Sequence, residues 1–210
     1  MSTQAVSKGP HPLLAKYLNQ LATHPLRTKA ITAALLYFLQ EVVASHIART
    51  PYRRVRRTAP LYDHLLSLAR IDTKSLKMAL YGFFVSAPLG HFLVGALQKV
   101  FAGKTGAKAR VGQILANNLI VSPIQACAYL TSMAVISGAR SKDEIMKTIK
   151  TGFLSVVRIT WVVSPLSMTI AQRYIPLHLW VPFFNAIQFV LGTYFNVRVK
   201  KARGREERRD

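Results

Sequence analysis

Polar and charged side chains within long apolar blocks are the residues of this sequence that could do chemistry. They are Gln40, Glu41, His91, Asn117, Asn118, Gln125, Arg158, Asn185 and Gln188. In a membrane, a charge at mid-bilayer costs at least about 2.5 kcal/mol, so Glu41 and Arg158 must face protein or water. Side chains of these types would line a path for small solutes. The candidate lining residues are Glu41, His91, Asn117 and Arg158.

The same residues have a purely structural interpretation. Glu41 and Arg158 could form an ion pair between helices, Glu41 could be held neutral, or Arg158 could extend to the interface. His91 and Asn117 would then be hydrogen-bond partners between helices. The sequence leaves open whether these residues line a path or lock the helices together.

Catalytic patterns are absent from the sequence. It contains no phosphate loop, no glycine-rich nucleotide fingerprint and no paired metal-ligand spacing. The six histidines are scattered, and Cys127 is the single cysteine, so it cannot form an internal disulfide. We therefore predict no enzyme and no catalytic, cofactor-binding or metal-binding residues. An intramembrane enzyme would need clustered acids or histidines, which the sequence does not show.

Five apolar blocks are long enough to position the polar residues within a membrane. A hydrocarbon core about 30 Å thick requires about 20 helical residues. The blocks run from Ala30 to Ala48, Leu76 to Phe101, Val111 to Gly138, Ile149 to Ala171 and Ile175 to Val197. Backbone groups in lipid must be paired within each segment, which favours helices. The fourth block contains Arg158 and is the doubtful span, since it could also lie at the interface.

The prediction is thus an all-α membrane protein, a bundle of four to five transmembrane helices. Residues 30–197 form its single domain, between a basic N-terminal segment, 1–29, and a charged tail, 198–210, expected to be disordered. A capping-box pattern from Ser141 to Glu144 predicts a helix start before the fourth block. The glycine- and lysine-rich stretch from Lys99 to Arg110 predicts a turn.

The formal net charge of +21 comes from 29 Lys and Arg against eight acidic residues. Nucleic-acid binders need such residues on a folded, soluble face. Here they flank apolar blocks, where each contributes about 1 kcal/mol next to anionic headgroups. We therefore expect membrane lipid, including anionic headgroups, and small solutes as partners, and no nucleic acid. The first connection carries a basic run from Arg53 to Arg57 and a segment from Leu61 to Leu68 that could lie on the membrane surface.

Prolines interrupt several blocks in a recurring context. Val-Ser followed by proline occurs at Val85–Pro88, Val121–Pro123 and Val163–Pro165. Helix-interior prolines remove a hydrogen bond and displace the carbonyl four residues earlier, which then needs another partner in lipid. The displaced carbonyls would include those of Phe84, Leu119 and Trp161. The predicted kinks lie at Pro88, Pro123, Pro165 and Pro182, around either a wet cavity or ordinary bent helices.

Gly82, Ser86 and Gly90 form a stripe of small residues at four-residue spacing. Such stripes allow helices to approach closely. We expect this stripe to pack one span against another rather than to form a dimer seam, although a homo-oligomer stays open.

The sequence resembles a family of small integral membrane proteins named for the 22-kilodalton peroxisomal membrane protein. The residues Leu14–Leu18, His24–Ala30 and Thr32–Ala34 resemble the pattern with which the family begins. Glu41 falls where the family usually has an aspartate. The stretch Ser86–Phe92 resembles its Gly-Pro…His-aromatic element. Trp161–Pro165, followed by Tyr174-Ile175-Pro176, resembles its Trp…Trp-Pro…Phe-x-x-Pro signature. The family's Asn-Phe pair reads Gln172-Arg173-Tyr174 here and its final Trp-Asn reads Leu191-Gly192, which marks a divergent, fungal-like member.

The resemblance implies four spans and a peroxisomal membrane, with the mitochondrial inner membrane as the alternative. It also implies a role as a nonselective pore for small solutes. Our hypothesis is a protein that forms or regulates a small-solute channel across the peroxisomal membrane. The rivals are an inner mitochondrial membrane protein supporting metabolite homeostasis, a non-conducting scaffold, and an assembly or import factor acting through its basic loops.

Overall fold

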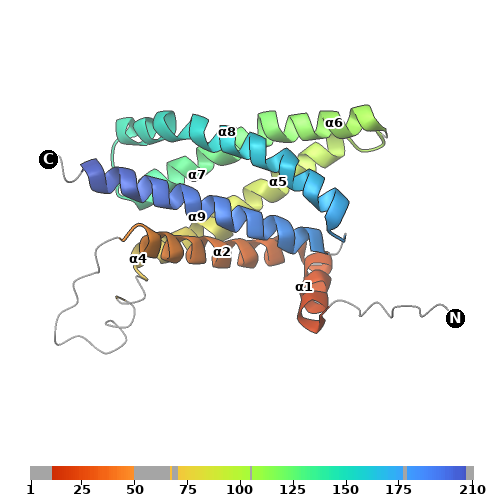
Figure 1. The fold of residues 1–210 in the computed structure, drawn as a ribbon, viewed down its shortest axis with the longest axis horizontal. Coiled ribbons are helices and arrows are strands. Elements are labelled where there is room, and N and C mark those ends of the chain that lie inside the picture. Colours follow the sequence, from red (N-terminus) through yellow and green to blue (C-terminus); the bar gives the residue numbers. More distant parts are fainter. Residues whose placement is uncertain (1–10, 50–66, 68–70, 105, 177–178, 207–210) are drawn as a thin grey trace.

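Long helices packed side by side make up the structure, a computed structural model that describes residues 11–49, 67, 71–104, 106–176 and 179–206 (Figure 1). These residues form helices and turns, and no strand occurs among them. The expected all-α bundle is confirmed. The basic run from Arg53 to Arg57 lies outside the described residues, as does the segment from Leu61 to Leu68 apart from Ser67.

Within the described ranges, the helices of two turns or more form five long passes and one short helix. The short helix is α1, Pro12–Thr23, which lies across one end of the bundle (Figure 1). The passes are α2, Pro25–Ile47; α4, Thr73–Tyr81, continued by η1, Gly82–Ser86, and α5, Ala87–Val100; α6, Ala107–Ala116, continued by η2, Asn117–Val121, and α7, Ser122–Ile136; α8, Lys142–Tyr174; and α9, Trp180–Glu206.

Four helical segments are long and apolar enough to cross a membrane. They are Pro25–Ile47, Thr73–Val100, Val111–Ile136 and Lys142–Ala171. The fourth predicted block, which was uncertain as a span because it contains Arg158, therefore lies in a helix that is long and apolar enough to cross a membrane. The last block forms most of α9, which is not among the four because residues such as Asn185, Gln188 and Asn196 lower its hydropathy.

Helix α9 nevertheless lies along α2 and runs in the same direction (Figure 1). Near the start of both helices, the Tyr17 hydroxyl of α1 lies within hydrogen-bonding distance of both Thr32 and Asn185. Near their ends, Lys200 pairs with Glu41. The chain thus passes along the bundle five times in alternating directions.

The expectation of a disordered tail from residue 198 is wrong for most of that segment. Helix α9 continues to Glu206. Lys and Arg are good helix formers, so a helix already established in the preceding apolar stretch extends through them. Charge composition alone does not predict this extension, and it places Lys200 against the bundle.

The predicted helix start before α8 is confirmed. Ser141 is its N-cap, and its hydroxyl accepts a hydrogen bond of 3.2 Å from the Glu144 amide. The Glu144 carboxylate accepts from the Arg140 amide at 3.0 Å instead of from the cap residue itself. The predicted turn before α6 contains Gly103 and Gly106 at φ of 77° and 106°, a region that favours glycine.

Two of the predicted proline kinks are built as π-helical turns. Both η1 and η2 are five residues long and end two residues before a proline, Pro88 and Pro123 respectively. In each, the next amide donates five residues back, as from Ser122 to the Asn117 carbonyl. A widened turn at this place gives the proline ring room beside the preceding backbone.

The π register changes which carbonyl loses its donor. The sequence predicted Leu119, four residues before Pro123, but a five-residue step assigns the Asn118 carbonyl to position 123. Proline has no N–H to donate, and the Trp161 indole of α8 donates to that carbonyl at 2.7 Å. A neighbouring helix therefore supplies the bond that the proline removes.

The other two prolines differ from this pattern. Pro165 lies inside α8, which continues through it as an α-helix. Pro182 is the third residue of α9, where backbone amides have no acceptor within the helix. The prediction of a mid-helix kink at Pro182 is therefore wrong, because α9 begins later than the apolar block does.

Close approach between α2 and the second pass depends on Gly82. A Cβ atom at this position would lie 2.7 Å from the Ala33 carbonyl oxygen and 2.8 Å from Tyr37. Ser86, one turn later, bonds the Tyr37 hydroxyl at 3.1 Å. Gly90 faces Gln125 of α7. The small-residue stripe thus packs against neighbouring helices of the same chain.

We expect Trp161→Phe to destabilise the protein by about 1–3 kcal/mol, because loss of the indole N–H leaves the Asn118 carbonyl of a membrane span without a donor. Pro123→Ala restores a backbone N–H, so Trp161→Phe should cost less in that background. Denaturant unfolding of the two single variants and the double variant in detergent micelles measures this coupling. Additive costs would contradict the assignment of this indole to the proline gap.

Candidate functional site

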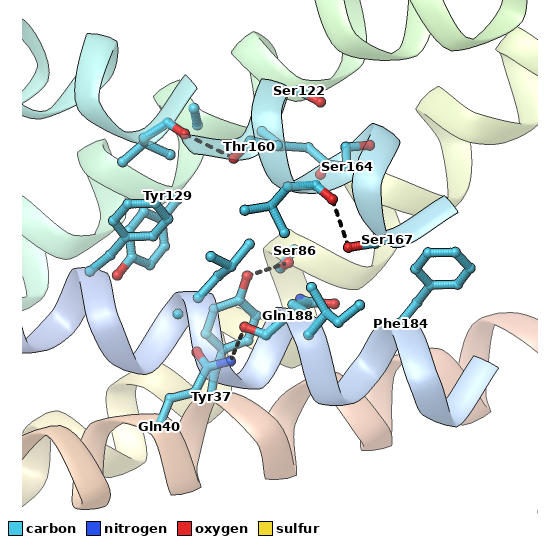
Figure 2. Close-up of a pocket in the computed structure, with 18 of the residues that line it drawn as sticks. Tyr37, Gln40, Ser86, Ser122, Tyr129, Thr160, Ser164, Ser167, Phe184 and Gln188 are labelled. Atoms are coloured by element: carbon cyan, nitrogen blue, oxygen red, sulfur yellow. Dashed lines mark hydrogen bonds between the residues drawn. The ribbon is translucent and has the colours of Figure 1, made fainter. Parts of the chain in front are cut away.

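A cavity of about 410 Å³ lies within the bundle between all five long passes (Figure 2). This volume falls within the range of roughly 300–1,000 Å³ that is typical of small-molecule sites. Four of the nine polar residues noted within the apolar blocks line it: Gln40, Asn117, Gln125 and Gln188. The cavity is therefore the candidate functional site.

Eight of the residues that line the cavity carry a hydroxyl group. Three come from tyrosines, Tyr37 of α2, Tyr81 of α4 and Tyr129 of α7. Their rings pack against one another, with centroids 5.0–6.5 Å apart. The remaining hydroxyls come from the second, third and fourth passes: Ser86, Ser122, Thr160, Ser164 and Ser167.

Amide side chains complete the polar lining, and Gln40 is the most constrained of them. It is fully buried, and its Nε2 donates to the Gln188 carbonyl at 3.2 Å. Its Oε1 has no hydrogen-bond partner in the structure. Gly192 makes room for this group, because a Cβ atom there would overlap the Gln40 carboxamide. The other lining amides are Asn117, Gln125 and Gln188.

Helical spacing explains why these residues share one cavity. Ser122, Gln125 and Tyr129 recur every three to four residues along α7, so they lie on one face. On α8 the lining residues extend from Val156 to Ser167. At 1.5 Å per residue this is about 16 Å, roughly half of a 30 Å hydrocarbon core. The cavity is a chamber and not a continuous pore.

An apolar and aromatic cluster lies against the chamber. Tyr81, Tyr129 and Phe195 belong both to its wall and to the buried core of the bundle. Met78, Leu130 and Met133 continue this core. The part of the wall that these side chains form is therefore tightly packed.

Glu41 lies beside this wall in a chain of polar contacts. Its carboxylate pairs with Lys200 through one oxygen, and the other accepts from the Asn196 side chain at 3.4 Å. Asn196 in turn accepts a hydrogen bond from the Tyr129 hydroxyl. Glu41 and Asn196 are buried. This series of contacts joins α2, α9 and α7 and ends at Tyr129, which lines the cavity.

The four predicted lining residues occupy different places. Asn117 lines the cavity, whereas Glu41, His91 and Arg158 are not among its lining residues. His91 is partly exposed on α5 next to Phe92, and Arg158 is exposed on α8. The ion pair of Glu41 is with Lys200.

Sequence reasoning missed the tyrosines and Lys200. Tyrosines count as apolar in a hydropathy pattern, and Lys200 falls just beyond the last block. In the described part of the chain, no group of three His, Cys, Asp or Glu side chains lies close enough to hold a metal ion.

Lys200→Met should destabilise the protein by about 3–5 kcal/mol, since it leaves the buried Glu41 charge unpaired. Adding Glu41→Gln should recover much of this loss, because it removes the orphaned charge. Lys201→Met, on an exposed neighbour of the same helix, is the control. Thermal unfolding in detergent compares these variants. Equal effects of Lys200→Met and Lys201→Met would show that the ion pair does not contribute to stability.

Comparison with known proteins supports the resemblance noted in the sequence. The Mpv17 / PMP22 family domain matches residues 134–196. The Woronin body membrane protein wscA of Aspergillus fumigatus is 53% identical over 90% of this chain and 78% of its own length. The Woronin sorting complex protein of Neurospora crassa is 42% identical over 90% of this chain, which spans only 58% of that relative. No solved structure matches the chain.

More distant relatives bear on the membrane in which the protein resides. The peroxisomal membrane protein PMP22 of Arabidopsis thaliana is 27% identical over 89% of this chain and 90% of its own length. Homologues of this kind are peroxisomal membrane proteins, which agrees with the expected peroxisomal membrane. A relative named SYM1 fits the mitochondrial alternative. With a 53% identical relative matched over most of both chains, this protein belongs to the Mpv17/PMP22 family.

Proposed function

We propose that this protein resides in the peroxisomal membrane and in that of Woronin bodies, where it forms or regulates a pathway for small solutes. The names of its relatives support the membrane. The observation that supports the pathway is the chamber of about 410 Å³ in the middle of the bundle, whose wall contains hydroxyl and amide groups.

The composition of the chamber wall favours a wet interior. Polar groups in an apolar environment cost free energy unless they are hydrogen-bonded. A bundle built only for packing would fill this space with apolar side chains, yet 12 of the 21 lining residues carry a hydroxyl or an amide. Some of these groups already have partners within the protein, such as Tyr37 with Ser86 and Ser167 with the Val163 carbonyl. Water or a small polar solute in the chamber would pair the hydrogen-bonding capacity that remains.

The length of the chamber indicates a closed state. It covers about half of the hydrocarbon core, so passage requires the bundle to open beyond it. The side chains of Tyr129 and Phe195 pack where α7 meets α9, and the contacts from Glu41 to Lys200 hold α9 against α2 nearby. Movement of α9 would therefore lengthen the path, whose width and lining then set selectivity.

Ser164→Phe should lower solute release from proteoliposomes by about tenfold or more, because a ring in place of a hydroxyl group fills part of the chamber. The matched control is Leu166→Phe on the same helix, where the side chain is exposed on the outside of the bundle. Release of neutral and charged markers of graded size measures both variants. Thermal unfolding confirms that each variant is folded.

Two outcomes would contradict the pathway. If folded wild-type protein releases no marker of any size, the protein does not form a solute pathway by itself. Equal release through Ser164→Phe and Leu166→Phe would place the path outside the chamber.

A second candidate is a sorting or scaffold role in Woronin body membranes without conduction. The relatives named Woronin body membrane protein and Woronin sorting complex protein, at 53% and 42% identity, favour it. In this role the polar residues would serve only to lock the helices.

The two candidates predict different results in Aspergillus fumigatus cells that lack their own relative. In the sorting role, this chain fused to a fluorescent protein should localise to Woronin body membranes, and Ser164→Phe should do so as well as Leu166→Phe. A requirement for an unfilled chamber would favour the solute pathway. Fluorescence on mitochondria instead would contradict both.

A further inference from the structure

Three serines that are far apart in the sequence meet in the chamber. Ser86, Ser122 and Ser164 are the serines of the three Val-Ser motifs that precede a proline, and each lies on a different pass. All three line the cavity (Figure 2). The recurring motif therefore supplies hydroxyl groups from three walls to a single space.

The hydroxyl groups of these serines can take further hydrogen-bond partners. Ser86 already bonds the Tyr37 hydroxyl at 3.1 Å, but a hydroxyl group has one donor and two acceptor sites, so a further partner can bind to it. Ser122 and Ser164 present the same group from the third and fourth passes. The chamber is thus suited to a ligand that carries its own hydroxyl groups.

The chamber offers nothing to balance an ion. Among the described residues that line it, none is Asp, Glu, Lys, Arg or His. The adjacent charges of Glu41 and Lys200 already pair with each other, with Asn196 between Glu41 and the wall residue Tyr129. An ion moved from water into such a space loses its hydration without gaining a counter-charge. A neutral hydroxyl-rich molecule instead exchanges water contacts for equivalent contacts with the wall.

We propose that the chamber binds neutral small solutes with several hydroxyl groups and disfavours ions of similar size. Ser86, Ser122 and Ser164 hold the hydroxyl groups of the solute. The preference during passage rests on the proposed pathway, whereas binding in the chamber does not.

Osmotic swelling of proteoliposomes tests the preference with molecules of three carbons, glycerol as the neutral probe and lactate as the anion. Wild-type protein should pass glycerol at least about tenfold faster than lactate. Ser122→Ala combined with Ser164→Ala keeps the width of the chamber but removes two hydroxyls, so glycerol flux should fall about tenfold. Ser155→Ala, on α8 outside the lining, is the control and should leave flux unchanged.

Binding is measured separately, as the rise in thermal stability of the detergent-solubilised protein with glycerol concentration. Binding to the folded state should stabilise wild type and Ser155→Ala more than the double alanine variant. The same rise in all three would reflect a general solvent effect and overturn the binding site. Equal flux of glycerol and lactate would overturn the preference while leaving the pathway intact. Absence of all flux would overturn the pathway alone, with the stability comparison still deciding the site.

Discussion

Hydrogen bonding of the backbone within lipid is the constraint on which this bundle depends. Three passes contain a proline that interrupts the backbone hydrogen bonds of the helix. In two of these passes, a π-helical turn ends two residues before the proline. The open carbonyl of Asn118 is then paired by Trp161 from another helix. Helix shape and helix packing are therefore coupled, because a pass interrupted in this way needs a neighbour to complete it. The serines beside these prolines lie where the passes surround the chamber instead of filling it.

Much of the fold could be predicted from the sequence because lipid permits few alternatives. Apolar blocks of at least 19 residues can only be helices, and the Ser141 cap marks the beginning of α8. The boundaries were harder to predict, since hydropathy reports what is apolar and not what is helical. Helix α9 shows both errors: it begins after the predicted block does, which moves Pro182 into its first turn, and it continues through basic residues to Glu206. The π-helical turns have no signature in hydropathy, and the recurring Val-Ser before proline does not separate the two π-helical turns from Pro165, where α8 stays α-helical.

The candidate site was less accessible to sequence reasoning, for a geometrical reason. Whether a polar residue lines a cavity or faces outward depends on its angle around the helix and on which helix lies next to it. Asn117 points to the chamber, whereas Arg158 is exposed. The partner of Glu41 could not be read from spacing, because α2 and α9 lie at opposite ends of the chain. The tyrosines were the signal available but unused: an aromatic residue with a hydroxyl inside an apolar block needs a polar neighbour or water.

The ion pair between Glu41 and Lys200 also has a consequence for biogenesis. The two residues are separated by 159 positions, so Glu41 is synthesised long before the side chain that neutralises it. Until α9 is complete, α2 carries a carboxylate that is costly to place in lipid. The first span is therefore less stable in the bilayer until the last helix supplies Lys200. The final docking of α9 would then be the step that completes the neutralisation of Glu41 and fixes the bundle.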